Sequence, residues 1–249
     1  MRHVTPPEIL RFYPSQPYPC PYLPERTARS CVATPAHLVD AATYSRLVRE
    51  GFRRSGHFSY GMICTQCEAC VSVRVPAARF QPDRSQRRTW QRWAGKLSAA
   101  EQPLVFIPEH FRLYRRYVMA RHDEADEDAS PENYEQFLLT SHIDTRLVEF
   151  RDPQGRVVIV SLVDVLDDGL SCVYTFYDPD DPRAGFGTWS ILWHIAQAQA
   201  SGMPYVYLGY WIARSRKMAY KARFRPLEGY WRGRWLPFER IEPLFRTLP

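Results

Sequence analysis

The second half of the chain shows the clearest periodicity of apolar and polar positions. Runs rich in β-branched and aromatic residues, separated by the turn sequences PQG and DDG, predict three strands over 145–152, 156–166 and 170–178. The apolar run 186–202, which ends at Gly202, predicts a buried helix, and 204–211 predicts a further strand.

The first half is less regular. Residues 1–35 hold eight of the 21 prolines and are expected to be an extended, wrapping segment. The remaining pattern predicts helices over 37–52, 83–101, 108–128 (with an acidic loop at its end) and 130–141, and a strand over 70–77. We expect an α+β fold with a smaller N-terminal, cysteine-containing α/β domain (1–104) and a second domain (105–249).

One loop stands between a predicted strand and the buried helix. Its sequence, DPDDPRAGFGTW, places Gly185 and Gly187 where backbone amides approach a helix N-terminus, with Arg183 beside them. Such a junction can bind a phosphate. A plain turn before a buried helix explains the same residues.

The charge is unevenly distributed. Residues 1–100 carry 15 basic against 6 acidic side chains, residues 101–200 carry 8 against 18, and residues 201–249 carry 10 against 3. Basic blocks of this kind suggest a polyanionic partner such as nucleic acid, although solvated faces give the same pattern. No secretory signal and no membrane-length apolar run is present, so we expect a cytoplasmic protein without a membrane partner.

Half of the six cysteines lie within seven positions, in the sequence CTQCEAC. Cys64, Cys67 and Cys70 can share one ion, but a closed zinc site needs a fourth ligand. Cys20, in the proline-rich segment, is the first choice. Cys31 and His57 are alternatives, and buried thiols without a metal are a further one.

Several segments resemble the arginyl-tRNA–protein transferase family, and in particular its bacterial leucyltransferase branch. They are PYLPERTARS, GFRRSGHFSY, CEACVSVRV, RSQRR, LYRRYVMARH, CVYTFYDPD, GTWSIL and YVYLGYWI with KMAYKARFRPLE, and they cover roughly residues 12–236. The resemblance implies an N-acetyltransferase-like (GNAT-type) second domain. It also implies leucyl-tRNA as donor, acceptor proteins that begin with Asp or Glu, and a product that carries an N-end rule degradation signal. Related transferases use N-terminal cysteines for a zinc or iron–sulfur site, which would be structural or redox-sensing here.

The implied reaction is aminolysis of an ester, which needs positioning, proton transfer and oxyanion stabilisation, but no metal or other cofactor. Asp178, Tyr174 and Tyr177 are candidate proton carriers. Lys217 and Lys221 are two of only three lysines in the chain. Because lysine can shift its pKa whereas arginine cannot, both are candidates for acid–base catalysis. Two solvated lysines on a helix face are the alternative.

The substrate-binding candidates follow from the same motifs. Arg53 and Arg54, with Ser55, could bind an acidic side chain or a tRNA phosphate. The loop DPDDPRAGFGTW (residues 178–189), called the anion loop below, and the YLGYWI motif add further candidates: Arg183, Gly185, Gly187, Thr188, Tyr210 and Trp211. The basic segment 84–93 offers Arg84, Arg87, Arg88 and Arg92 to tRNA, with Trp90 and Trp93 either stacking on bases or facing the core.

Two other functions remain open. An acetyl-CoA-dependent acyltransferase shares the expected fold, but its phosphate signature differs from RAGFGT by one position. A non-catalytic, zinc-containing RNA-binding module would explain the cysteines and the basic blocks, but not the YLGYWI and KMAYK segments.

Overall fold

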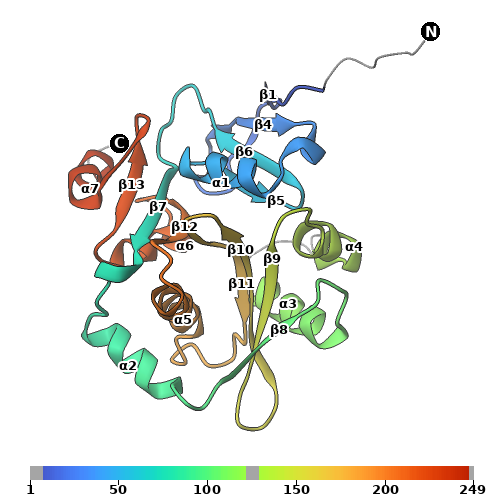
Figure 1. Ribbon diagram of the computed structural model, residues 1–249, viewed down its shortest axis with the longest axis vertical. Coiled ribbons are helices and arrows are strands. Elements are labelled where there is room, and N and C mark those ends of the chain that lie inside the picture. The colour runs from blue at the N-terminus through green and yellow to red at the C-terminus, as the bar shows by residue number, and fades with distance from the viewer. Residues whose placement is uncertain (1–7, 122–128, 247–249) are drawn as a thin grey trace.

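A computed structural model describes residues 8–121 and 129–246, which are organised around one eight-stranded sheet (Figure 1). The strand order is β14-β13-β7-β12-β11-β10-β9-β8, and every neighbouring pair is antiparallel except β11 and β12, which are parallel. The strands are β7 (Val71–Pro76), β8 (Ser98–Gln102), β9 (Thr145–Arg151), β10 (Val157–Leu166), β11 (Gly169–Tyr177), β12 (Tyr205–Trp211), β13 (Glu228–Trp231) and β14 (Arg234–Pro237).

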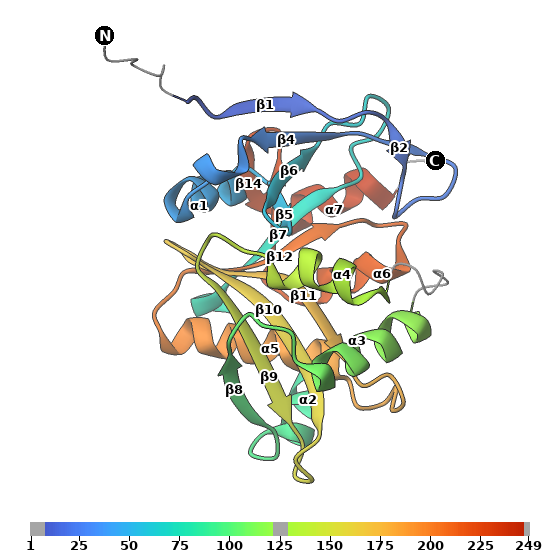
Figure 2. The ribbon, with the colours of Figure 1, turned by 90° about the vertical axis from the view of Figure 1, so that its right-hand side faces the viewer.

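A smaller sheet lies across one end of the large one (Figure 2). Its order is β1-β4-β6-β5, with β1 (Arg11–Pro14), β4 (Ser30–Thr34), β5 (Arg53–Ser55) and β6 (Phe58–Met62). The proline-rich segment, described from residue 8 onward, thus contributes paired strands, including the two-residue strands β2 (Tyr18–Pro19) and β3 (Thr27–Ala28). Helix α1 (Ala41–Arg49) begins after Asp40, whose side chain caps it, and lies beside this sheet.

Helices cover both faces of the large sheet. The strongly apolar α5 (Phe186–Ala200) packs on one face with α2 (Arg84–Trp93), and α3 (Pro108–Arg121) and α4 (Pro131–Tyr134) lie on the other (Figures 1 and 2). Short helices α6 (Arg216–Ala219) and η5 (Tyr220–Arg223) follow β12, and α7 (Phe238–Arg246) ends the described chain. Each face buries its own apolar cluster. None of the described helices is long and apolar enough to cross a membrane.

The mixed α+β class is confirmed, as are the three central strands, the helix that follows them and strand β12. One prediction is wrong: 83–101 is not a single helix. Helix α2 ends at Trp93, Gly95 adopts a positive φ of 71°, and Ser98–Gln102 pairs with β9 as the edge strand β8. Strand pairing overrides the helix propensity of this alanine-containing stretch. The acidic end of the helix expected over 108–128 lies outside the described residues after position 121.

The large sheet takes strands from both sides of the division expected at residues 104 and 105. β7 and β8 precede that division, and β7 lies between β12 and β13. Strands from both predicted domains therefore belong to one sheet and share its core.

Candidate active site

The two parallel strands separate soon after they begin. β11 and β12 pair only over Gly169–Ser171 and Tyr205–Tyr207. Beyond this point the carbonyls of Cys172 and Val173 accept hydrogen bonds from Nη2 of Arg53, at 3.1 and 3.3 Å. A side chain from the small sheet therefore occupies the gap between two strands of the large one.

Gly209 makes room for this arginine. It has a positive φ of 77°, and a Cβ atom built on it would lie 2.4 Å from Cζ of Arg53. Only a residue without a side chain allows the guanidinium to approach the backbone of β12 so closely. The glycine of the YLGYWI motif thus explains the position of Arg53.

Lys221 reaches the same place from η5. Its Nζ donates a hydrogen bond to the carbonyl of Tyr210 at 2.7 Å and lies 3.2 Å from the sulfur of Met218. The side chain is buried, with 7% exposure. Burial, followed by the positive charge of Arg53, lowers its pKa from 10.5 to about 7. Lys221 can therefore exchange a proton near neutral pH.

Several tyrosines surround these two cations. The rings of Tyr60 and Tyr210 lie 6.4 Å apart, and burial raises the pKa of both hydroxyls and of Tyr22. The Tyr210 hydroxyl is buried and has no hydrogen-bond partner among the described residues. Tyr220 interacts electrostatically with Arg53 and Tyr177. Sequence reasoning missed Tyr22, Tyr60 and Tyr220, because a tyrosine among 15 carries no local signal.

Arg54 points to the opposite face of β5 and is engaged internally. Its guanidinium makes two bonds to the Asp164 carboxylate, at 2.8 and 2.7 Å, and further bonds to the Gly56 carbonyl and the Thr145 hydroxyl. Side-chain exposure is 2% for Arg54 and 0% for Asp164. This geometry does not suit Arg54 to bind a substrate carboxylate, and only Arg53 and Ser55 of the expected trio remain available.

The other catalytic candidates lie at the end of β11 or on the surface. The Tyr177 ring would be 3.0 Å from a Cβ atom on Gly187, and Tyr174 packs against Phe137. Asp178 accepts a hydrogen bond from Arg116 at 2.9 Å. Lys217 lies exposed on α6. The structure thus brings Lys221, but not Lys217, into the gap with Arg53.

The anion loop is held by α2. The indole of Trp93 donates to the carbonyl of Ala184 at 2.8 Å, and Arg92 donates to the carbonyl of Arg183. A Cβ atom on Gly185, the N-cap of α5, would lie 3.0 Å from Thr89. The loop residues Gly185, Gly187 and Thr188 are half-buried, whereas Arg183 is exposed.

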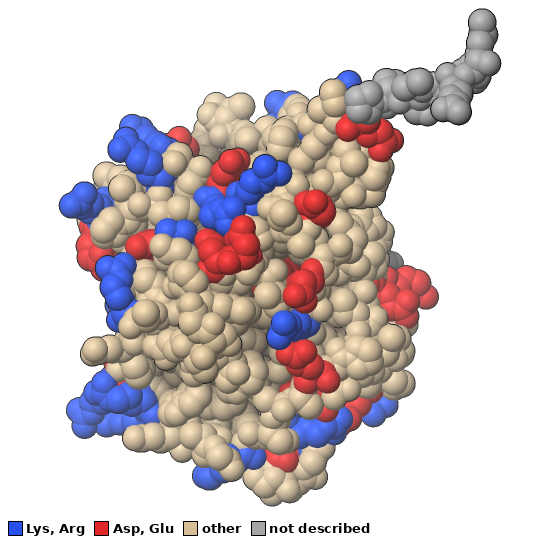
Figure 3. Space-filling model, in the orientation of Figure 1, with Lys and Arg blue, Asp and Glu red and all other residues tan. Residues whose placement is uncertain are grey.

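The arginines of α2 form a basic surface next to this loop. Arg84, Arg87, Arg88 and Arg92 are all exposed, and basic side chains gather over α2 at the lower left of Figure 3. The tryptophans face inward: Trp90 stacks on Trp189 with ring centroids 5.7 Å apart, and Trp93 lies 4.9 Å from Phe186. Of the two alternatives for this pair, the core-facing one is observed. Trp211 is also a core residue, 2% exposed and edge-on to Phe238.

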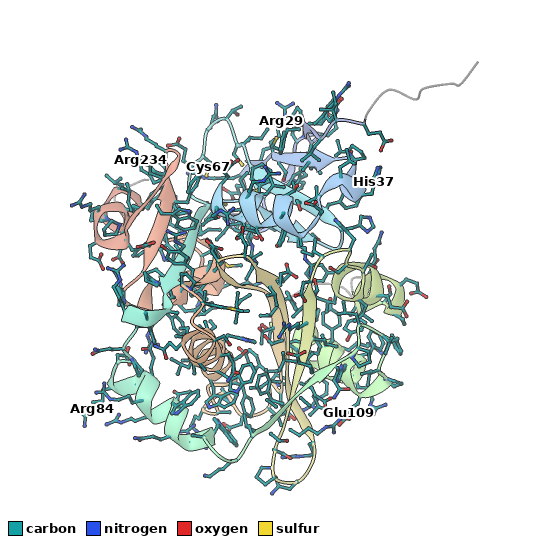
Figure 4. All side chains as sticks on the ribbon, viewed as in Figure 1. Arg29, His37, Cys67, Arg84, Glu109 and Arg234 are labelled. Carbon is teal, nitrogen blue, oxygen red and sulfur yellow. The ribbon has the colours of Figure 1, made fainter. Side chains whose placement is uncertain are left out.

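Four cysteines interact near the other end of the molecule, where Figure 4 labels Cys67 far from Arg84 of α2. Burial, followed by the charges of Cys20, Cys64 and Cys67, raises the pKa of Cys70 to about 12. All six cysteines are free thiols, and no group of three or more His, Cys, Asp or Glu side chains among the described residues is arranged to hold a metal ion. The sequence-predicted set thus comes together, with its sulfurs not in a coordinating arrangement.

Comparison with known proteins identifies the class. Residues 18–88 match the family model for the N terminus of arginine-tRNA-protein transferase, and residues 109–230 match the model for its C terminus. These matches define an aminoacyltransferase.

Curated relatives narrow the assignment. The chain is 51% identical over 229 residues to a protein of Chromobacterium violaceum, covering 91% of this chain and 93% of the relative. It is 50% identical over 237 residues to a protein of Nitrosospira multiformis, covering 95% and 94%. Both are named "Aspartate/glutamate leucyltransferase". The chain therefore belongs to the arginine-tRNA-protein transferase family, in the group whose members carry that name.

Among solved structures, the chain is similar to "The structure of L-PGS from Bacillus licheniformis", with a TM-score of 0.48 and 13% identity, over 70% of this chain and 63% of that one.

Proposed function

We propose that this protein transfers leucine from leucyl-tRNA to the N-terminal Asp or Glu of acceptor proteins, which creates an N-end rule degradation signal. The names of its curated relatives support this reaction. The observation that carries it is the proximity of Arg53 and Lys221 where β11 and β12 separate: Arg53 is a fixed cation bonded to β11, and Lys221 is bonded to β12 and has a pKa lowered to about 7.

Arg53 is the acceptor-binding cation. A guanidinium has five N–H donors, and the two bonds to β11 both use Nη2. The rest of the group can pair with the carboxylate of an N-terminal Asp or Glu. An uncharged Asn or Gln would leave this half-buried cation without an anionic partner.

Lys221 moves the proton. The α-amine of the acceptor has a pKa near 8 and must lose protons as it attacks the ester carbonyl. Neutral Lys221 takes a proton as the C–N bond forms, and returns it to the ribose 3′-oxygen as the C–O bond breaks. The Tyr210 hydroxyl, which has no hydrogen-bond partner within residues 8–121 and 129–246, is a donor for the oxyanion that forms between these steps.

Leucyl-tRNA, the donor, binds on the side of the molecule that carries α2. The exposed arginines of α2 lie beside the N-terminus of α5, where amides of the Gly185–Thr188 turn can bind phosphates of the tRNA acceptor end. Parallel strands that separate, with a helix connecting them, are also the arrangement of a GNAT-type domain, and we assign the large sheet and α5 to that fold.

The cysteine cluster serves the N-terminal part of the molecule. Cys20, Cys64, Cys67 and Cys70 supply the sulfur ligands that zinc or an iron–sulfur cluster prefers, and binding would deprotonate these thiols and draw their sulfurs closer. The ion would tie the segment around Cys20 to the CTQCEAC loop. Aminolysis of an activated ester requires nothing from it.

The test is transfer of radiolabelled leucine from leucyl-tRNA to peptides that begin with Asp, Glu, Asn or Gln. We expect label in the Asp and Glu peptides only. In Arg53→Gln, transfer should fall more than tenfold while tRNA binding stays unchanged, because one charge-assisted pair is worth roughly 1.5–3 kcal/mol. Arg146→Gln, at an exposed arginine on β9, is the control. Acetylation from acetyl-CoA, or tRNA binding without any transfer, would refute the proposal.

A further inference from the structure

A groove of about 450 Å³ runs along the small sheet. One wall comes from the chain around β2, and the floor comes from β4, β5 and β6. Its larger side chains are those of Tyr18, Tyr22, Val32, Phe58, Tyr60 and Met62.

Arg53 does not itself line this groove, but Ser55, two residues further along β5, does. In the register of the hairpin, Arg53 is opposite Tyr60, and Ser55 is opposite Phe58. Side chains alternate along a strand, so these four residues share one face of the sheet, while Arg54 points to the other. Ser55 lies about 7 Å from Arg53 along the strand, at two residues of roughly 3.4 Å each. A chain whose first side chain pairs with Arg53 can therefore continue directly over Ser55 and Phe58.

The chemistry of the groove selects its occupant. None of its lining residues is charged. Over Val32, Phe58 and Met62 a polynucleotide would place phosphates against uncharged side chains, and a Lys or Glu side chain would lose water without a charged partner. Phe58 nevertheless exposes 49% of its surface, which is apolar area that a ligand can cover. An apolar peptide segment fits these properties.

We propose that this groove binds the acceptor residues that follow the acidic N-terminal residue, and that it favours an apolar side chain at the second or third position. The inference rests on the proposed function, since it takes Arg53 as the site of the first residue. Acceptor choice would then depend on an acidic residue followed by an apolar one.

The experiment compares four peptides that differ only near their N-terminus: Asp-Ala-Ala, Asp-Leu-Ala, Asp-Ala-Leu and Asp-Lys-Ala, each with the same remaining sequence and a C-terminal fluorophore. With leucyl-tRNA saturating, kcat/KM for each peptide and peptide affinity (by fluorescence anisotropy) are measured, and the KM for leucyl-tRNA is measured in a separate titration. Covering one leucine side chain should raise kcat/KM and affinity roughly tenfold or more over Asp-Ala-Ala. Asp-Lys-Ala should be the poorest of the four.

Two variants tie the preference to the groove. Phe58→Ala should remove most of the advantage that the leucine-containing peptides have over Asp-Ala-Ala. Phe12→Ala is the matched control, because Phe12 has 47% exposure on the same sheet and does not line the groove. It should keep the wild-type preference.

The outcomes separate the two proposals. Equal kcat/KM for all four peptides, or a Phe58→Ala effect on the KM for leucyl-tRNA instead of on the peptide, would overturn the groove assignment while transfer itself stands. Absence of transfer to every peptide would refute the proposed function, and the anisotropy ranking would still decide whether the groove binds apolar residues.

Discussion

Replacement of Lys221 by methionine tests the proton-transfer site most directly. The difference between the ordinary pKa of 10.5 and about 7 in the folded protein corresponds to roughly 5 kcal/mol. Between these two values the unfolded chain binds a proton that the folded chain does not, so the free energy of unfolding rises with pH, by about 1.4 kcal/mol per pH unit at most. This gain in the free energy of unfolding is fully present above pH 10.5, where the lysine is neutral in both states, and is lost as the pH falls to 7.

Denaturant unfolding at several pH values measures this effect. From pH 6 to pH 9 the wild-type protein should gain roughly 3 kcal/mol relative to Lys221→Met, which has no titrating group at this position. Comparison with the variant cancels the contributions of other groups. If the two curves rise in parallel, Lys221 does not lose its proton near neutral pH in the folded protein.

Single-turnover transfer measures the chemical role. We expect the wild-type rate to rise with pH through about 7, as neutral Lys221 becomes available. Lys221→Met should lose about 100-fold or more, which is the usual contribution of a general base, and should lose this inflection. Lys96→Met, at an exposed lysine in the turn after α2, should keep both rate and profile. A slower Lys221→Met enzyme with an unchanged pH profile would refute the assignment.

Three further predictions concern the surroundings of the site. Gly209→Ala should displace Arg53 and reduce transfer at least tenfold, whereas Gly155→Ala, with nearly the same φ but open space, should not; equal losses would mean that backbone strain alone is responsible. Asp164→Asn should lower the free energy of unfolding by about 3–5 kcal/mol in a denaturant titration, because it leaves a buried guanidinium without its counter-charge, and a loss below 1 kcal/mol would contradict that account. Cys20→Ser should lower zinc or iron per chain, measured by mass spectrometry of protein purified under reducing conditions; metal content equal to that of the wild type would exclude Cys20 as a ligand.

Local patterns were sufficient where one face or stripe of an element is buried. The strands β9, β10 and β11 and the helix α5 follow from alternation, turns and apolar content, because each packs in the core as its sequence implies. The proximity of Arg53 and Lys221 could not be predicted in this way. The two residues are far apart in the chain. They come near each other only in the folded sheet, where β11 and β12 separate and leave room for both side chains.

Adjacent arginines illustrate the same limit. The sequence GFRRSG offers Arg53 and Arg54 as equals. Strand alternation sends one toward the gap and the other toward a buried aspartate, and this assignment depends on where β5 docks. Likewise, the absence of a side chain at Gly209 is visible in the sequence, but the guanidinium that needs the space is not.

The central position of β7 has a consequence for synthesis. This strand leaves the ribosome early, yet both of its neighbours, β12 and β13, are translated roughly 130 or more residues later. During that interval its valine-rich edges have no partner and are open to pairing with other chains. We therefore expect a nascent chain stalled before residue 205 to be prone to aggregation and sensitive to proteases. The small sheet, which carries Arg53 and the groove, should gain its final order only when translation is nearly complete.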